Sequence, residues 1–373
     1  MKTLFFPLPK CSRLLMNPAC YAPVLLLTAL LHPCESRAAE EREWVKMETG
    51  TTEHFNGKTS LAVYSDRFVV AAGTNQTALL YNGTEWKPFP GINDSTLYGD
   101  GRDYALPLGG VAVASPTRVF FANYGGSANT TRRLFRWNEE TWDRVQPTGS
   151  YDRLTSVWSA RNSERVLVGT LAGIYGSNDG KTGWSLVSTN TVKAVQIRSI
   201  SDDKIFALQL SDTPAIHLST DGGLSFTGSI SGLPASTLAF APVAEDSIWV
   251  VGEGGMISHW DGTGFQAQSS TTTQDLRNVF AFSSTDVWAV GAANTLLHFD
   301  GTAWTQQVLD LDQQYTFYDI AGDQLGNLYI AGSDGLILYA RAIPEPAAVA
   351  LVLPALAWLW VGSRLRSSKG GQR

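Results

Sequence analysis

The sequence predicts an all-β fold. Glycine, serine and threonine are frequent through the middle of the chain, and tryptophan and tyrosine are plentiful. The apolar runs there are short and are interrupted by turns of glycine, asparagine and aspartate, and no long run follows the helical period. Short strands separated by such turns are typical of an all-β domain. The segment between the two ends of the chain, about 300 residues, is long enough for a large core or for two domains.

A repeated segment narrows this class to one architecture. The segment from Asp286, DVWAVGAANTLLHFDGTAWTQQ, follows the same scheme as the segment from Ser247, SIWVVGEGGMISHWDGTGFQAQ. Each has an apolar strand ending in glycine, a short turn, a second apolar strand, a polar turn and an aromatic residue. Full or partial copies lie at 68–89, 134–145, 177–184, 219–226 and 327–340. The aromatic residues that end the copies are Trp86, Trp142, Trp184, Phe226, Phe265 and Trp304.

The spacing of these aromatic residues predicts a β-propeller. They recur about every 42 residues, apart from one longer interval of about 56, and a repeat of about 40 to 50 residues with four strands is a propeller blade. Trp44 lies one such interval before Trp86, and the last copy ends without an aromatic residue. We therefore predict a seven-bladed β-propeller over residues 39–341, in which the N-terminal strand completes the last blade and closes the ring. A blade miscounted around residues 91–130 would change the number to six or eight.

Two of the polar turns resemble the Asp-box, or BNR, repeat, Ser-x-Asp-x-Gly-x-Thr-Trp. The closer match consists of Ser219, Asp221, Gly223 and Phe226, and the looser one of Ser177, Asp179 and Trp184. Lys181 stands where the looser match should have glycine. The hydroxyl and the carboxylate can accept hydrogen bonds from the turn while the aromatic side chain fills the blade, which is a role in folding. Sialidases contain such boxes, and so do many non-enzymatic propellers, so the resemblance implies no activity.

The N-terminus has the features of a secretory signal peptide over residues 1–38. Three basic residues come first: Lys2, Lys10 and Arg13. An apolar stretch follows at 21–31, and small residues then allow cleavage after Ala38. A lipoprotein signal at Cys34 is the alternative, but His32 and Pro33 do not fit a lipobox. All three cysteines lie in this leader, at Cys11, Cys20 and Cys34, so we expect a mature chain without disulfides.

The C-terminal segment, residues 342–373, contains a sorting motif, an apolar run and a basic tail. The motif is Pro344, Glu345 and Pro346, the run covers 347–362, and the tail carries Arg364, Arg366 and Lys369. This order resembles the PEP-CTERM signal, which exosortase-type proteases process in exopolysaccharide-producing Gram-negative bacteria. The resemblance implies export across the inner membrane, a C-terminal transmembrane helix with a cytoplasmic basic tail, and a body at the cell surface or released from it. An anchor that is never cleaved is the alternative.

Several function classes find little support. His217, His259 and His298 occupy equivalent third-strand positions, but positions a blade apart cannot share one metal ion, so we predict no metal site. The sequence has no glycine-rich phosphate loop, zinc-protease motif or nucleophile elbow, so we predict no cofactor and no catalytic residue. The net charge of −6 argues against a nucleic-acid partner. A sialidase-like glycoside hydrolase stays a distant alternative, since no arginine cluster for the sugar carboxylate is evident.

Two long segments depart from the repeat and form the candidate ligand site. By strand counting, 91–110 joins the outer strand of blade one to the inner strand of blade two, and 122–133 joins the middle strands of blade two. Both therefore emerge on one face. The candidate residues are Asp94, Tyr98, Asp100, Asp103, Tyr104, Tyr124 and Asn129. Tyrosine faces and side-chain oxygens suit sugars, although a long loop without a ligand is equally compatible with the sequence.

The sequence thus predicts a non-enzymatic propeller, at the cell surface or secreted, that binds exopolysaccharide or a surface protein after exosortase-type sorting. The alternative is an extracytoplasmic assembly or scaffold factor, because the repeats resemble those of the photosystem-assembly propellers, which also carry BNR-like motifs.

Overall fold

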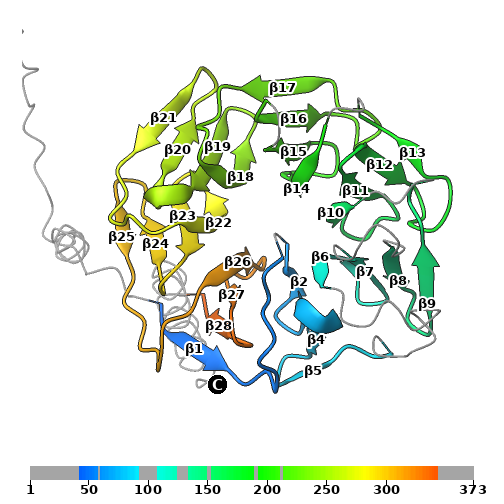
Figure 1. Cartoon of the computed structure of the whole chain (residues 1–373), viewed down its shortest axis with the longest axis horizontal. Coiled ribbons are helices and arrows are strands. Elements are labelled where there is room, and N and C mark those ends of the chain that lie inside the picture. The colour runs from blue at the N-terminus through cyan, green and yellow to red at the C-terminus, as the bar shows by residue number, and fades with distance from the viewer. Residues whose placement is uncertain are drawn as a thin grey trace, which may run out of the picture. The chain divides into compact units, whose positions relative to one another are not determined.

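The computed structural model describes residues 42–57, 59–91, 107–123, 133–148, 153–188, 192–210 and 213–342. These residues form seven four-stranded antiparallel sheets, arranged as blades around a central axis (Figure 1). The predicted all-β, seven-bladed propeller is confirmed. The predicted signal peptide with its cysteines lies outside the described residues, and so do the sorting motif, the apolar run and the basic tail.

In every blade the first strand lies nearest the axis and the fourth lies at the rim. Blade one consists of β2 (Leu61–Ser65), β3 (Phe68–Ala72), β4 (Ala78–Tyr81) and β5 (Trp86–Pro88). Blade two consists of β6 (Leu108–Ser115), β7 (Arg118–Asn123), β8 (Leu134–Trp137) and β9 (Trp142–Val145). Blade three consists of β10 (Leu154–Ser159), β11 (Val166–Thr170), β12 (Gly173–Ser177) and β13 (Ser185–Leu186).

The other four blades follow the same order. Blade four consists of β14 (Ala194–Ser199), β15 (Ile205–Gln209), β16 (Ala215–Ser219) and β17 (Gly228–Ser231). Blade five consists of β18 (Thr237–Ala244), β19 (Ser247–Gly252), β20 (Ile257–Trp260) and β21 (Phe265–Gln268). Blade six consists of β22 (Leu276–Ser283), β23 (Asp286–Gly291), β24 (Leu296–Phe299) and β25 (Trp304–Gln306). Blade seven consists of β26 (Phe317–Gly322), β27 (Leu328–Gly332), β28 (Ile337–Ala340) and β1 (Trp44–Met47).

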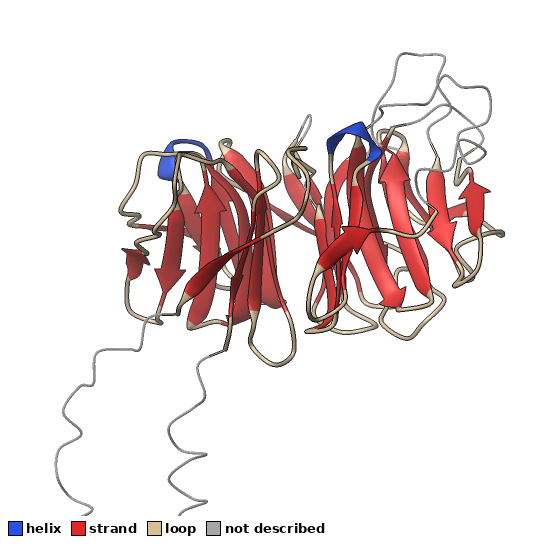
Figure 2. Cartoon of the chain, turned by 90° about the horizontal axis from the view of Figure 1, so that it is seen from below, coloured by secondary structure: helices blue, strands red, loops and turns tan. Residues whose placement is uncertain are grey.

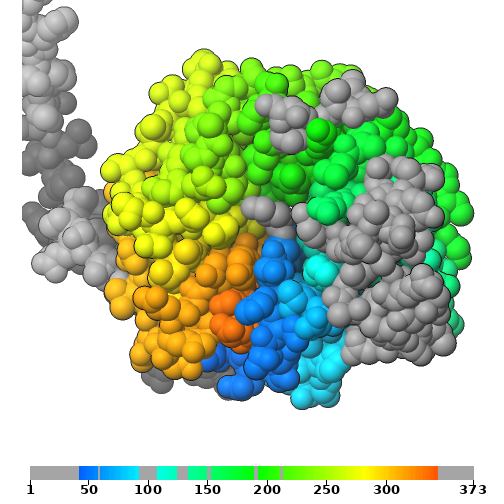
Figure 3. Space-filling model, viewed as in Figure 1, coloured from blue at the N-terminus to red at the C-terminus, as the bar shows by residue number. Residues whose placement is uncertain are grey.

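The first strand of the described chain closes the ring, as the spacing of Trp44 predicted. β1 pairs antiparallel with β28, so that Trp44 lies opposite Ala340. Arg42 adds two hydrogen bonds across this closure, from Nη1 to the carbonyl oxygens of Gly326 (2.7 Å) and Arg341 (3.3 Å). In the space-filling view, the blue start of the described chain lies directly against the orange end (Figure 3).

An apolar cluster fills each of the seven contacts between neighbouring blades. The second strands are apolar along nearly their whole length because neighbouring blades cover both of their faces; β19 and β23, for example, expose almost none of their side chains after the first residue. Each cluster includes one of the aromatic residues that end the repeats: Trp44, Trp86, Trp142, Trp184, Phe226, Phe265 and Trp304. Each of these side chains packs between its own blade and the preceding one, and the repeat spacing therefore reflects the blade contacts.

Helical structure among the described residues amounts to two single 3-10 turns. These are η2 (Thr74–Gln76) and η4 (Glu253–Gly255), which join the second and third strands of blades one and five. They appear in blue on the upper edge of the ring in Figure 2 and mark the face to which the second-to-third-strand turns belong. No helix in the described part of the chain is long and apolar enough to cross a membrane.

Candidate functional site at the centre of the ring

A backbone irregularity repeats near the start of the inner strands. In six blades the pairing of the inner strand with the second strand skips one residue: Gly109, Thr155, Val195, Leu238, Arg277 and Tyr318. A bulge of this kind turns the following side chains relative to a regular strand. The next residues are all buried: Gly110, Ser156, Gln196, Ala239, Asn278 and Asp319. Four of these six are polar, although they lie in otherwise apolar strands.

Polar side chains from three blades meet at this level, and we call Gln196, Arg198, Asn278 and Asp319 the central polar cluster. The Asn278 Nδ2 donates a hydrogen bond to Asp319 Oδ1 (2.6 Å). The Asn278 Oδ1 accepts one from Gln196 Nε2 (3.3 Å) and one from Arg198 Nη2 (3.1 Å). Arg198 therefore reaches from blade four across to blade six, and its Nη2 lies 3.9 Å from Asp319 Oδ1 on blade seven.

Backbone groups extend the cluster to two further blades. The amide of Leu61, in blade one, donates to Asp319 Oδ2 (2.8 Å), and the amide of Phe240, in blade five, donates to Gln196 Oε1 (3.3 Å). The amide of Ile320 donates to Asp319 Oδ1 (2.9 Å). The cluster thus links five of the seven blades at the axis. Because buried polar groups are costly unless they are bonded, this network also fixes how the inner strands are placed.

Burial dominates the electrostatics of the cluster. Asp319 is 2% exposed, and burial raises its pKa to about 7 against the opposing effects of the Arg198 charge and the backbone amides. Burial lowers the pKa of Arg198, while Asp319 acts in the other direction. The Arg198 Nε is buried and has no hydrogen-bond partner. The guanidinium therefore keeps donor capacity that the cluster does not use.

Two cavities lie at the axis, one at each end of the inner strands. Along β14, Val195 lines a cavity of about 330 Å³, Gln196 belongs to the central polar cluster, and 197–199 line a cavity of about 250 Å³. The smaller cavity is formed by the inner strands of blades three to six and includes Arg198. It lies at the ends of the inner strands opposite to those near η2 and η4.

The candidate ligand residues on the two long segments lie outside the described residues. This applies to Asp94, Tyr98, Asp100, Asp103, Tyr104, Tyr124 and Asn129. The strand order agrees with the strand count that located both segments, since β5 precedes β6 and β7 precedes β8 at those positions. The central polar cluster was missed at the sequence level. Its signal is present, because Gln196, Asn278 and Asp319 are polar residues at one equivalent position of three apolar inner strands.

The closer of the two Asp-box-like turns is held together by Ser219 and Asp221. The Ser219 Oγ donates to Asp221 Oδ1 (2.7 Å) and accepts from the amide of Gly223 (2.9 Å). Ser225 donates to Asp221 through its amide (2.9 Å) and its Oγ (2.6 Å). Burial opposes ionisation of this carboxylate, but the hydrogen bonds outweigh it and lower the pKa of Asp221 to about 2. Phe226 packs into the contact between blades three and four.

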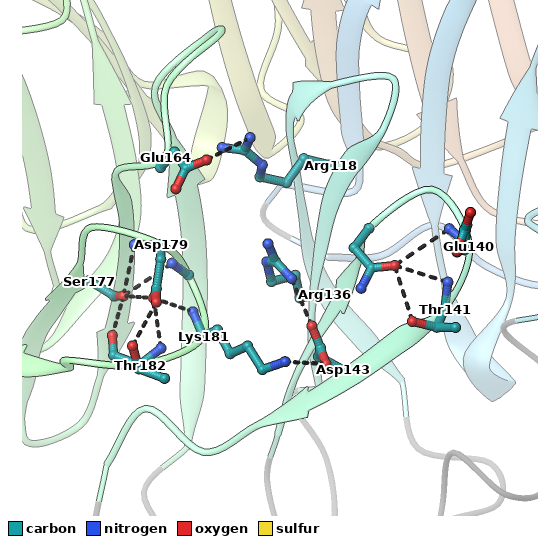
Figure 4. Close-up of polar contacts among 12 residues, drawn as sticks. Arg118, Arg136, Glu140, Thr141, Asp143, Glu164, Ser177, Asp179, Lys181 and Thr182 are labelled. Atoms are coloured by element: carbon teal, nitrogen blue, oxygen red, sulfur yellow. Dashed lines mark hydrogen bonds and ion pairs between the residues drawn. The ribbon is translucent and has the colours of Figure 1, made fainter.

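The looser turn makes the same contacts one residue earlier (Figure 4). Asp179 accepts from the amide (2.7 Å) and Oγ1 (2.6 Å) of Thr182, and the amide of Gly180 donates to Ser177 Oγ (3.1 Å). Gly180 therefore occupies the place that Gly223 has in the other turn. The sequence alignment that gave this place to Lys181 was wrong, because the turn is one residue shorter between the aspartate and the glycine. Trp184 still packs into the contact between blades two and three.

Lys181 instead joins two blades. In Figure 4 its side chain and that of Arg136 point at Asp143 on β9. The Lys181 Nζ lies 3.0 Å from Asp143 Oδ1, and Arg136 Nη1 lies 2.7 Å from Oδ2. Burial acts to raise the pKa of Asp143, but these two partners hold it below its usual range.

Two of the three aligned histidines, His259 and His298, pack on a tryptophan of their own blade. His298 stacks on Trp288 with ring centroids 4.0 Å apart, and its Nε2 lies 3.0 Å from Asp286 Oδ1. His259 packs against Trp249 at a centroid distance of 4.4 Å, with the two rings tilted by 34°. Burial lowers the pKa of His217, whose Nε2 has no partner. Among the described residues, no group of three or more histidine, cysteine, aspartate or glutamate side chains could hold a metal ion.

Comparison with known proteins shows a shared fold. No protein-family model matches the chain, and no curated protein matches it. The solved structure of YCF48 from Cyanidioschyzon merolae is similar, with a TM-score of 0.63 and 16% identity over 80% of this chain and 98% of that one. A structure of YCF48 bound to D1 peptide has a TM-score of 0.62 and 14% identity over 81% of this chain and 97% of that one.

A glycoside hydrolase shares the architecture as well. The GH74 xyloglucanase from Xanthomonas campestris has a TM-score of 0.60 and 13% identity over 79% of this chain and 53% of the enzyme. At such low sequence identities, the similarity shows that the propeller fold is shared and does not show a shared function. Function must be argued from the site.

Proposed function

We propose that the protein is a non-enzymatic binding propeller of the cell surface or the extracellular space, with matrix exopolysaccharide as its ligand. The observation that carries this proposal is the cavity at the ring centre, which Trp158, Phe280 and Arg198 line together. Aromatic rings with a few polar groups are the usual composition of a sugar-binding surface. The two turn carboxylates, Asp179 and Asp221, and Asp319 in the cluster all accept hydrogen bonds that hold the fold, which favours binding over catalysis.

The sorting tail supports a place outside the cytoplasm. The triplet at 344–346 and the apolar run after it resemble a signal read by an exosortase-type protease. We expect Pro344→Ala or Glu345→Ala to leave a longer, membrane-retained species in a host that has this protease. An immunoblot of membrane and medium fractions measures this, and an unchanged product would favour a permanent anchor.

Polysaccharide binding is tested with the purified full-length chain in detergent. We expect retention on immobilised exopolysaccharide of the producing organism, and elution by the same polysaccharide in solution. Bovine serum albumin serves as the non-binding control. No retention on any polysaccharide of a glycan array would overturn the proposal.

A protein partner is the second candidate. The likeness to YCF48, one structure of which holds a D1 peptide, favours an extracytoplasmic assembly or scaffold factor. Crosslinking in the native membrane would then yield a defined membrane complex in place of polysaccharide. The likeness to a xyloglucanase keeps a glycoside hydrolase as a distant third candidate, and release of reducing sugar from xyloglucan tests it.

A further inference from the structure

We propose that the smaller axial cavity binds one hexuronate unit of an acidic polysaccharide, with the sugar carboxylate on the guanidinium of Arg198. This inference rests on the proposed function and names the class of sugar that the site selects. It assigns a ligand to a specific cavity, built by residues that the long segments do not contribute.

The size of the cavity suits a single sugar ring. Its volume is about 250 Å³. Pockets for drug-sized ligands measure about 300 to 1,000 Å³, so this cavity is too small for an oligosaccharide and adequate for one ring. A uronate at the end of a chain, or one that projects as a branch, would fit.

Arg198 supplies the charge. It is half-buried, with 21% of its side chain exposed, so a ligand can reach it from the cavity while the surroundings shield it from solvent ions. Asn278 accepts one hydrogen bond from Nη2. The Nε is buried, so a ligand must be bound by the terminal nitrogens Nη1 and Nη2. Four of the five donors of a guanidinium are on its terminal nitrogens, in a planar fork that matches a carboxylate, and three of these four remain for a ligand after the bond to Asn278.

Asp319 does not saturate this guanidinium. Its Oδ1 lies 3.9 Å from Arg198 Nη2, beyond hydrogen-bond distance. Its oxygens accept instead from the amides of Leu61 and Ile320 and from the Asn278 side chain. The arrangement holds Arg198 in place through Asn278 while its remaining donors stay available.

The cavity walls complete the site. Trp158 and Phe280 come from the first and the last of the four strands that form the cavity, and both are half-buried. Aromatic side chains present apolar faces on which the C–H face of a pyranose packs. The Trp158 Nε1 donates to Ser199 Oγ (3.2 Å), which leaves the Ser199 hydroxyl hydrogen for a sugar oxygen.

The test compares two sugars that differ at one carbon. Galacturonate carries a carboxylate where galactose carries a hydroxymethyl group, and saturation-transfer NMR with the full-length chain measures both. We expect galacturonate to bind at least about tenfold more tightly than galactose, and Arg198→Gln to remove that preference. Arg118→Gln is the matched control, because Arg118 is also partly buried and pairs with Glu164 away from the cavity; it should keep the preference.

A second variant covers the case in which Arg198→Gln fails to fold. Trp158→Leu leaves Arg198 and Asn278 in place and removes one wall, so we expect at least about fivefold weaker binding of galacturonate. Circular dichroism establishes that each variant is folded. Binding of galacturonate that neither variant changes would overturn the inference, and so would equal affinity for the two sugars.

The same proteins on immobilised polygalacturonate and dextran separate this inference from the proposed function. Retention on dextran, or retention on polygalacturonate that Arg198→Gln does not reduce, would refute the uronate site and leave polysaccharide binding standing. Retention on neither polymer, with no binding of galacturonate, would refute the uronate site, and the glycan array would then decide separately whether the protein binds any polysaccharide.

Discussion

At the scale of single residues, Asp319 is a buried carboxylate at the axis that accepts hydrogen bonds from blades one, six and seven. Burial raises its pKa to about 7, above the ordinary value of about 4 for an aspartate. Between these two values the folded protein keeps a proton that the unfolded chain has lost. The free energy of unfolding therefore contains a contribution from Asp319 that is full below about pH 4 and decreases as the pH rises to about 7.

Asp319→Asn should make stability less dependent on pH across this window. The asparagine does not titrate, so the difference in unfolding free energy between pH 4.5 and pH 7.5 should shrink by up to about 3 kcal/mol relative to the wild type. Urea unfolding at both pH values measures it. Wild-type and variant curves that change in parallel would show that Asp319 ionises at its ordinary pKa, with the amides of Leu61 and Ile320 stabilising the charge.

The aspartate of an Asp-box-like turn should contribute through its hydrogen bonds. Asp221→Ala removes the acceptor of two bonds from Ser225 and one from Ser219, and we expect it to lower the unfolding free energy by about 1 to 2 kcal/mol. Asp202→Ala, at an exposed position in a neighbouring turn, is the control and should have little effect. Equal urea midpoints for the two variants would contradict a folding role of the turn.

At the scale of elements, the turn between β12 and β13 shows why alignment alone misplaced a glycine. Gly180 has a φ of +66°, and a Cβ there would lie 2.5 Å from Phe120 Cε1, a ring that is fully buried. Gly223 meets the same requirement in the next blade, with a φ of +78° and a Cβ position 2.7 Å from Leu167. In both turns a glycine is needed because the backbone lies close to a side chain of the preceding blade. The length of the turn determines which residue comes to this position.

Two alanine substitutions in this turn separate steric contact from backbone strain. Gly183 has a φ of +61° and nothing within 4 Å of its Cβ position. Gly183→Ala should therefore cost about 1 kcal/mol of unfolding free energy, from the left-handed backbone alone. Gly180→Ala should cost about 2 to 4 kcal/mol, because it adds the clash with Phe120. Denaturant midpoints compare the two, and equal costs would mean that Phe120 moves aside freely.

At the scale of the whole molecule, the sequence repeats predicted the ring because each blade repeats one local pattern of strands and turns. The closure was predictable too, since Trp44 lies one repeat interval before Trp86 and the last copy lacks an aromatic residue. The central polar cluster was harder to foresee. Gln196, Asn278 and Asp319 share one strand position, but the same position holds glycine, serine or alanine in blades two, three and five, so no repeated motif predicts that the three side chains meet.

We expect the stability of the ring and its monomeric state to depend on β1, the outer strand of blade seven. Without residues 42–47, β28 loses its partner, and a propeller blade with an open edge can pair with another molecule. Trp44, which packs edge-on against Trp288 with centroids 5.8 Å apart, would also leave the contact between blades six and seven. We expect the truncated chain to melt at a lower temperature and to form oligomers in light scattering after size-exclusion chromatography.

Two point variants separate the contribution of the Trp44 side chain from that of the strand pairing between β1 and β28. Trp44→Ala keeps the strand and removes the side chain, and it should lower the unfolding free energy by about 3 kcal/mol while the protein stays monomeric. Val45→Ser, on the same strand with 49% of the residue exposed, should change stability by less than about 0.5 kcal/mol. If the truncated chain remained a monomer with the stability of Trp44→Ala, the paired edge of β28 would contribute nothing beyond the tryptophan. In that case the apolar packing between blades six, seven and one would hold the ring closed. The hydrogen bonds of Arg42 and the pairing of β1 with β28 would add no stability.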